Sequence, residues 1–105
     1  MLKFNHVGIP TNKKRKNEVY IETSKVYLSM DKSSPYKIEW LRFEKDSPMP
    51  KLIQEVAHPC YEVDDIHEAT KDKKVILEPT HVGGNMTIAF IEVDGAPVEF
   101  LKINK

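Results

Sequence analysis

The sequence has few of the features that would place a protein outside the reducing interior of a cell. It contains a single cysteine, Cys60, so an internal disulfide is excluded and a reducing compartment is favoured. The segment from Met1 to Asn5 lacks the long apolar stretch of a signal peptide, and no apolar run approaches membrane-spanning length. We therefore expect a cytoplasmic protein with no membrane partner.

The chain also lacks a net charge, because 16 basic and 16 acidic residues balance. Nothing in this balance predicts a nucleic acid or an anionic membrane as a partner. The one basic cluster, Lys13 to Lys16, has no interleaved aromatic residues and is typical of a solvated loop. We therefore expect no nucleic-acid partner.

At 105 residues the chain predicts one domain with a modest core. Alternation of apolar and polar residues, bounded by turn residues, predicts a sheet-rich chain. The expected strands are Leu2 to Ile9, Glu18 to Ile21, Lys25 to Met30, Tyr36 to Glu44, a central strand within Val56 to Asp65, Lys73 to Leu77, Asn85 to Val93 and Pro97 to Ile103. The segment Glu78 to Gly84, with its proline, histidine and glycines, is expected to be a loop.

Helical signals are few. Asp65 and Glu68 stand in the relation of a capping box, which predicts a short helix directly after the central strand. Lys51 to Val56 is compatible with a helical turn. Thr11 to Glu18 is too polar and too short for a packed helix in the corresponding place of the first half.

The two halves of the chain begin alike, each with an apolar strand that carries one histidine. In the first strand His6 shares a face with Phe4 and Gly8, and the central strand carries His58. The second half follows a β-α-β-β-β order, and the first half is a compressed version of it. We divide the single domain into module one (about 1–47), a proline-containing linker (46–50) and module two (about 51–105).

One carboxylate is expected in an unusual place. Glu39 shares a strand face with Leu41 and Phe43, where a charged group is costly unless another group pairs with it.

Five stretches of sequence carry a resemblance to a known group of proteins: Phe4 to Ile9, Ile38 to Leu41, Ala57 to Asp65, Gly83 to Phe90 and Gly95 to Leu101. Together they resemble the vicinal oxygen chelate superfamily, which includes glyoxalases, bleomycin-resistance proteins and dioxygenases, and Gly83 to Phe90 resembles a pattern of glyoxalase I. The resemblance implies an α+β fold in which paired βαβββ modules form a cupped mixed sheet. Here the helix of the first module is largely missing.

The resemblance also implies a metal site on the first and last strands of each module. Residue by residue, its ligands fall on His6, Glu39, His58 and Glu99. Two imidazole nitrogens and two carboxylate oxygens suit one divalent ion such as Zn, Ni, Co, Mn or Fe. They leave positions for water or for two vicinal oxygens of a substrate.

The function implied is that of a metal-dependent lyase or isomerase of the glyoxalase type. It would act on a small substrate with vicinal oxygens through an enediolate-like intermediate, with Glu99 or Glu39 as the base. The segments that hold glutathione in glyoxalase I have no counterpart in this chain. The alternative is a non-catalytic small-molecule-binding protein of the antibiotic-sequestering type. The reduced first module favours this alternative, whereas the complete ligand set counts against it.

Other candidate residues receive structural interpretations. We expect His67 on the surface of the short helix, His81 in a loop, and Cys60 as a small buried residue rather than a nucleophile. Trp40 and Arg42 would bind an anionic or planar substrate, or else cover the outer sheet face or a dimer interface.

A homodimer is also expected. With a single short helix, the chain has too little material to cover Ile38 and Trp40 on one face, or Ile88, Phe90 and Val98 in the second half. Two-fold pairing is the commonest way to cover such residues. Whether the ligands come from one chain or two is left open by the sequence.

Overall fold

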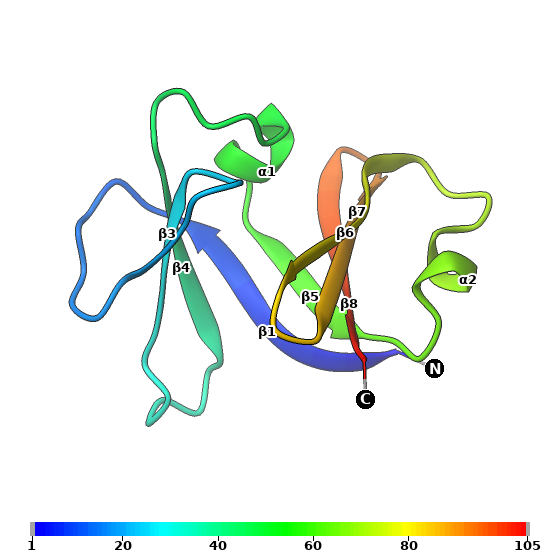
Figure 1. The fold of residues 1–105 in the computed structure, drawn as a ribbon, viewed down its shortest axis with the longest axis horizontal. Helices are drawn as coiled ribbons and strands as arrows, with labels where there is room; N and C mark the ends of the chain where they lie inside the picture. The colour runs from blue at the N-terminus through cyan, green and yellow to red at the C-terminus, as the bar shows by residue number, and fades with distance from the viewer. Residues whose placement is uncertain (1, 105) are drawn as a thin grey trace.

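The computed structural model describes residues 2–104, which form one eight-stranded mixed sheet with two short helices (Figure 1). The strands are β1 (Lys3–Pro10), β2 (Val19–Ile21), β3 (Val26–Met30), β4 (Ile38–Phe43), β5 (His58–Glu62), β6 (Val75–Gly83), β7 (Met86–Val93) and β8 (Ala96–Ile103). The helices are α1 (Lys51–Glu55) and α2 (Ile66–Thr70). Neither of these helices is long and apolar enough to cross a membrane, and the described residues contain no other.

The strand order repeats itself in the two halves. Across the sheet it is β2-β3-β4-β1-β5-β8-β7-β6, so each half leads outward from its first strand through its last strand. In both halves the first and last strands are parallel and the next two pairs are antiparallel. The antiparallel pair of β1 and β5 joins the halves at the centre. This is the cupped α+β sheet of paired modules that the sequence predicts, assembled within one chain.

The sheet curls into a half-barrel. Figure 1 shows the arm made by β3 and β4 and the arm made by β6 and β7 on either side of the central strands. Because side chains alternate along a strand, each strand gives one face to the inside of the cup and one to its outside. The inner face carries the cleft, and the outer face must be covered by other elements.

In the second half α2 covers the outer face of the sheet. Its Ile66 packs into a buried cluster with residues of β7, β8 and the segment after β5, namely Val63, Ala89, Ile91 and Phe100. The helix begins as its sequence predicts, because the Asp65 carboxylate accepts hydrogen bonds from the backbone N–H groups of His67 and Glu68, both at 3.1 Å. The His67 side chain is exposed, as expected.

In the first half a polar loop covers the outer face in place of a helix. The guanidinium of Arg15 lies 4.4 Å from the centroid of the Trp40 ring. The Glu18 carboxylate accepts two hydrogen bonds from Arg42, from Nε at 2.8 Å and from Nη2 at 2.7 Å. These hydrogen bonds lower the pKa of Glu18 to about 2. Trp40 and Arg42 therefore hold the loop on the outer face and point away from the inside of the cup.

The expected loop at Glu78 to Gly84 is wrong for most of its length, because β6 continues to Gly83. The pairing of β6 with β7 shifts register at three points, and Pro79 lies within one of these irregular steps. Proline and glycine are tolerated in edge strands and at bulges, so residues that usually mark a loop here mark an irregular edge. His81 lies on this edge strand, exposed, with Nε2 2.9 Å from the carbonyl oxygen of Gly84.

Several apolar residues that were expected to be covered by a partner chain are covered by residues of the same chain. Val98 packs against the α2 cluster, Phe90 is buried on the inner face, and Trp40 lies beneath Arg15. Large apolar side chains still exposed include Tyr36 at 73%, Val19 at 61% and Leu2 at 55%. The case for a second copy therefore rests on fewer residues than the sequence suggests.

Candidate metal centre

The register of the two central strands places the two histidines on the inner face. In the antiparallel pair of β1 and β5, His6 lies opposite Cys60 and Gly8 lies opposite His58. Each histidine thus faces a small residue of the other strand. The imidazoles gain room above the sheet where the two halves meet.

The neighbouring parallel strands supply the two carboxylates in the same way. Glu39 on β4 pairs with Gly8, which is two residues after His6. Glu99 on β8 pairs with Cys60, which is two residues after His58. Each half therefore builds the same histidine–carboxylate arrangement, and the β1–β5 pair brings the two arrangements together.

Gly8 is required by the position of His58. A Cβ atom at Gly8 would lie 2.5 Å from both Cε1 and Nε2 of the His58 ring, closer than such atoms approach in proteins. Any other residue at this position would displace the ring. A glycine inside a strand signals a close approach of this kind, but the sequence does not name the partner.

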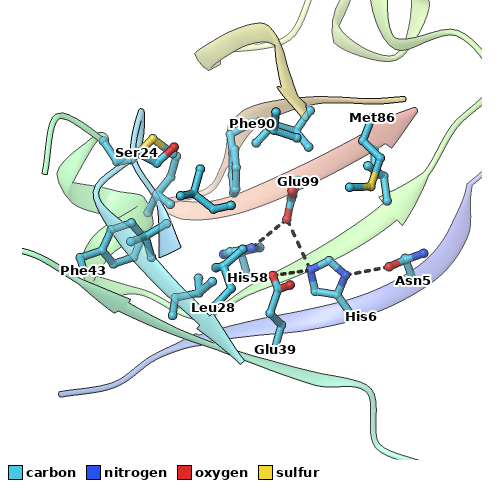
Figure 2. Close-up of a pocket in the computed structure, with 18 of the residues that line it drawn as sticks. Asn5, His6, Ser24, Leu28, Glu39, Phe43, His58, Met86, Phe90 and Glu99 are labelled. Atoms are coloured by element: carbon cyan, nitrogen blue, oxygen red, sulfur yellow. Dashed lines mark hydrogen bonds and ion pairs between the residues drawn. The ribbon is translucent and has the colours of Figure 1, made fainter. Parts of the chain in front are cut away.

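The four predicted ligands form one continuous set of contacts (Figure 2). His6 Nε2 lies 3.3 Å from Glu39 Oε1 and 3.7 Å from Glu99 Oε1. Glu99 Oε1 in turn lies 3.0 Å from His58 Nε2. His6, His58 and Glu99 are buried, whereas the Glu39 side chain is 25% exposed.

The tautomer of His6 follows from its neighbour Asn5, which the sequence did not single out. Nδ1 of His6 lies 2.7 Å from Asn5 Oδ1, and because that oxygen can only accept, Nδ1 carries the hydrogen. In the neutral ring the lone pair is then on Nε2, which is buried without a hydrogen-bond partner among residues 2–104. A lone pair facing two carboxylate oxygens is unfavourable unless a cation, either a proton or a metal ion, lies between them.

The pKa of His6 reflects this competition. Burial lowers it, but the close approach of the Glu39 carboxylate and the charges of Glu39 and Glu99 together outweigh burial and raise the pKa above the ordinary value of 6.5. A cation at Nε2 of His6 is therefore more favourable than on an isolated imidazole.

His58 is held more tightly than His6. It is 2% exposed, and its ring meets the ring of Phe90 edge-on, with centroids 4.8 Å apart at 81°. Its Nδ1 has no hydrogen-bond partner among the described residues, while Nε2 faces Glu99. The imidazole is fixed by packing against Phe90 and Gly8 and by its contact with Glu99.

Cys60 lies beside these groups. Ligand atoms of His6, Cys60 and Glu99 all lie within 4.8 Å of one another. The thiol is fully buried, and burial, followed by the charge of Glu99, raises its pKa. In the absence of a metal it is a neutral thiol, which agrees with the expectation that it is not a nucleophile.

The donor set fits a divalent ion. Metal–ligand bonds of about 2.0–2.2 Å place neighbouring donor atoms roughly 3.0–3.6 Å apart. Three contacts join the four residues in the order Glu39, His6, Glu99 and His58, at 3.3, 3.7 and 3.0 Å, and the donors that lie within 4.8 Å of one another as a group of three are those of His6, Glu99 and Cys60. Two imidazoles and two carboxylates are ligands that Zn, Ni, Co, Mn and Fe accept. The buried lone pair of His6 is a further reason for a cation at this place.

The four residues lie in the wall of a cleft of about 280 Å³ on the inner face of the sheet. Most of the lining is apolar and comes from both halves and from α1: Val26, Leu28, Leu41, Phe43, Met49, Ile53, Met86, Ile88, Phe90 and Leu101. Polar groups are thus concentrated at the tetrad, an arrangement usual in sites for small molecules.

Comparison with known proteins supports the fold. No protein-family model matches the chain, and a search of curated proteins finds no similar sequence. Among solved structures, hypothetical protein BH1468 from Bacillus halodurans C-125 is similar with a TM-score of 0.73 at 20% identity, covering 99% of this chain and 96% of the other. Methylmalonyl-CoA epimerase from Mycobacterium tuberculosis is similar with a TM-score of 0.67 at 14% identity, covering 98% of this chain and 89% of the other.

At these identities the two neighbours establish the fold and leave the activity to be argued from the site. They support the cupped α+β sheet of paired modules that the sequence predicts. Neither neighbour is described as a glyoxalase.

The raised pKa of His6 leads to a prediction for the metal-free protein. An NMR titration of His6 should give a midpoint above about 6.5, and Glu39→Gln should lower this midpoint because it removes the largest favourable partner. The contribution of His6 to the free energy of unfolding should be fully present below about pH 6.5 and should be lost as the pH rises through the folded-state pKa. Glu78→Gln, at an exposed position of β6, is the matched control and should leave the midpoint unchanged. A His6 midpoint below 6.5 in the wild type would contradict this account of the site.

Proposed function

We propose that the protein is a divalent-metal-dependent isomerase or lyase of the glyoxalase type. The observation that carries the proposal is the convergence of two histidines and two carboxylates from four strands on one apolar cleft. His6, Glu39, His58 and Glu99 would hold the ion, with Asn5 fixing the His6 tautomer as an outer hydrogen-bond acceptor.

The cleft supports a small substrate with two neighbouring oxygens. A volume of about 280 Å³ lies just below the usual range for ligand pockets, roughly 300–1,000 Å³. Away from the tetrad the lining is apolar apart from Ser24, so the oxygens of a substrate find most of their polar partners at the tetrad end. The remainder of the substrate would then be a compact apolar group in contact with residues such as Phe43 and Ile88.

The two carboxylates differ in a way that supports different roles. Glu99 contacts both histidines and its side chain is 10% exposed, whereas Glu39 contacts His6 alone and is 25% exposed. We assign Glu99 to anchoring and Glu39 to proton transfer, because a base must move between its resting contact and the substrate carbon.

The reaction then follows from these roles. A divalent ion held by His6, His58 and Glu99 would supply Lewis-acid polarisation of the substrate oxygens and so make the adjacent C–H bond more acidic. Glu39 removes the proton from that carbon, giving an enediolate-like intermediate, and returns it to the same or the neighbouring carbon. The apolar walls keep water away from the proton during this transfer. A fold neighbour that is an epimerase supports an isomerase over a lyase.

The alternative is a binding protein that sequesters a small molecule without reaction. An apolar cleft suits that role as well. A binder of apolar compounds has no use, however, for two carboxylates and an unpaired imidazole lone pair in its wall, since burying such groups is costly. The site therefore favours the enzyme.

Metal binding is the first test of the proposal. Protein purified without chelators or a metal-binding tag should contain one divalent ion per chain by elemental analysis. His58→Ala and Glu99→Gln should each reduce affinity in calorimetry by more than about 100-fold, since changes to outer-shell partners alone cost about 10–100-fold. Affinity should fall as the pH drops through the raised pKa of His6, because proton and metal compete for Nε2.

His67→Ala, on the exposed side of α2, is the control and should leave metal affinity unchanged. Absence of uptake of Zn, Ni, Co, Mn and Fe by the wild type would remove the proposal.

Proton transfer is the second test. The metal-loaded protein should exchange deuterium from D₂O into the carbon next to the oxygens of small α-hydroxycarbonyl compounds, followed by NMR. Glu39→Gln should slow this exchange by about 10²–10⁴-fold, the usual contribution of a positioned base. Glu78→Gln should exchange at the wild-type rate. Tight binding of such compounds with no exchange by the metal-loaded wild type would favour the sequestering protein instead.

We also propose a homodimer in which each chain carries its own complete site. Light scattering at micromolar concentration should give twice the mass of the chain. Because His6 and His58 both contact Glu99 of the same chain, mixing a His6→Ala chain with a His58→Ala chain should not restore metal affinity. A stable monomer would contradict the dimer, and rescue in the mixture would contradict the single-chain site.

A further inference from the structure

One polar group at the centre has no task in the proposed function: the thiol of Cys60. It is fully buried on the inner face of β5, opposite His6 on β1 and paired with Glu99 on β8. Its sulfur and the ligand atoms of these two residues all lie within 4.8 Å of one another. No other three potential ligands meet this condition among residues 2–104.

A second observation, independent of the cysteine, points to the same place. The His6 side chain is 9% exposed, and its Nε2 has no hydrogen-bond partner within the described chain although it faces the carboxylates of Glu39 and Glu99. A buried donor atom without a partner, directed at a cluster of further donor atoms, is the arrangement expected of a metal ligand.

We propose that the Cys60 sulfur is a direct metal donor alongside His6 and Glu99. The inference rests on the proposed function, because it concerns the same ion. On binding, the S–H bond breaks, the proton leaves to solvent and the sulfur lone pair forms the metal–sulfur bond, with no change in oxidation state. A thiolate shifts the preference of the site toward thiophilic ions such as Zn²⁺, Co²⁺ and Cd²⁺ and away from Mn²⁺.

The comparison of the two halves favours this role over simple space filling. The position equivalent to Cys60 in the first half is Gly8, and it must lack a side chain because His58 occupies that space. Opposite His6, strand β5 has room for a side chain. The residue there is Cys60, whose sulfur lies within 4.8 Å of ligand atoms of His6 and Glu99. The two halves thus share four ligands by repetition, and the second half alone adds a fifth.

The test is the absorption spectrum of the full-length protein titrated with Co²⁺. Cobalt bound by the tetrad gives visible ligand-field bands, and a thiolate ligand adds an intense charge-transfer band in the near ultraviolet. We expect both in the wild type. In Cys60→Ala the charge-transfer band should vanish while the visible bands persist, and the preference for Zn²⁺ over Mn²⁺ in competition should fall by about tenfold or more.

The outcomes separate the two proposals. Visible bands without a charge-transfer band in the wild type would overturn the role of Cys60 and leave the proposed function intact. No cobalt bands at all in the wild type would overturn both. Since the wild-type spectrum decides alone, the test holds even if Cys60→Ala folds poorly, and Cys60→Ser, which keeps the size but replaces the sulfur, should also lose the charge-transfer band.

Discussion

The antiparallel register of β1 against β5 is the constraint on which the rest of the molecule depends. It places His6 opposite Cys60 and Gly8 opposite His58, and it is the only pairing that joins the two halves within the described sheet. Because side chains alternate, a slip of one residue would turn one histidine to the outer face. The His58 ring fits over Gly8 because this register places the residue without a side chain directly opposite it. Fold and site are therefore fixed by the same hydrogen bonds.

This register also creates an electrostatic problem, because it gathers ionisable groups where little water reaches them. Glu39 and Glu99 both face His6 Nε2, and only a cation between them makes the arrangement favourable. A proton serves this purpose in part, as the raised pKa of His6 shows. A divalent ion would serve it better, since it satisfies both carboxylates and both imidazoles at once. Binding of the ion and stability of the fold are then thermodynamically linked.

The sequence predicts what is local and what is repeated. Period-two alternation located the strands, the capping box located α2, and the repeated histidine strands led through the resemblance to all four residues that the structure brings together. Contacts between distant segments were beyond it. The role of Gly8 depends on a ring from another strand, and the cover supplied by Arg15 depends on Trp40 in β4. Pro79 suggested a loop because the sequence does not show that β6 lies at the edge of the sheet, where proline is tolerated.

The different covers of the two halves offer a physical reason for the different roles that we propose for the two carboxylates. Glu99 lies on β8, next to Phe100, which is packed beneath α2 in the buried cluster, so its strand is held from behind by apolar contacts. Glu39 lies on β4, whose outer face is covered by a polar loop through Arg15 and by the Glu18 pair with Arg42. The Glu18–Arg42 pair, with side chains 7% and 25% exposed, loses part of its attraction to the cost of removing charges from water, whereas apolar packing carries no such cost. The half without a packed helix therefore carries Glu39, the carboxylate that we propose as the base.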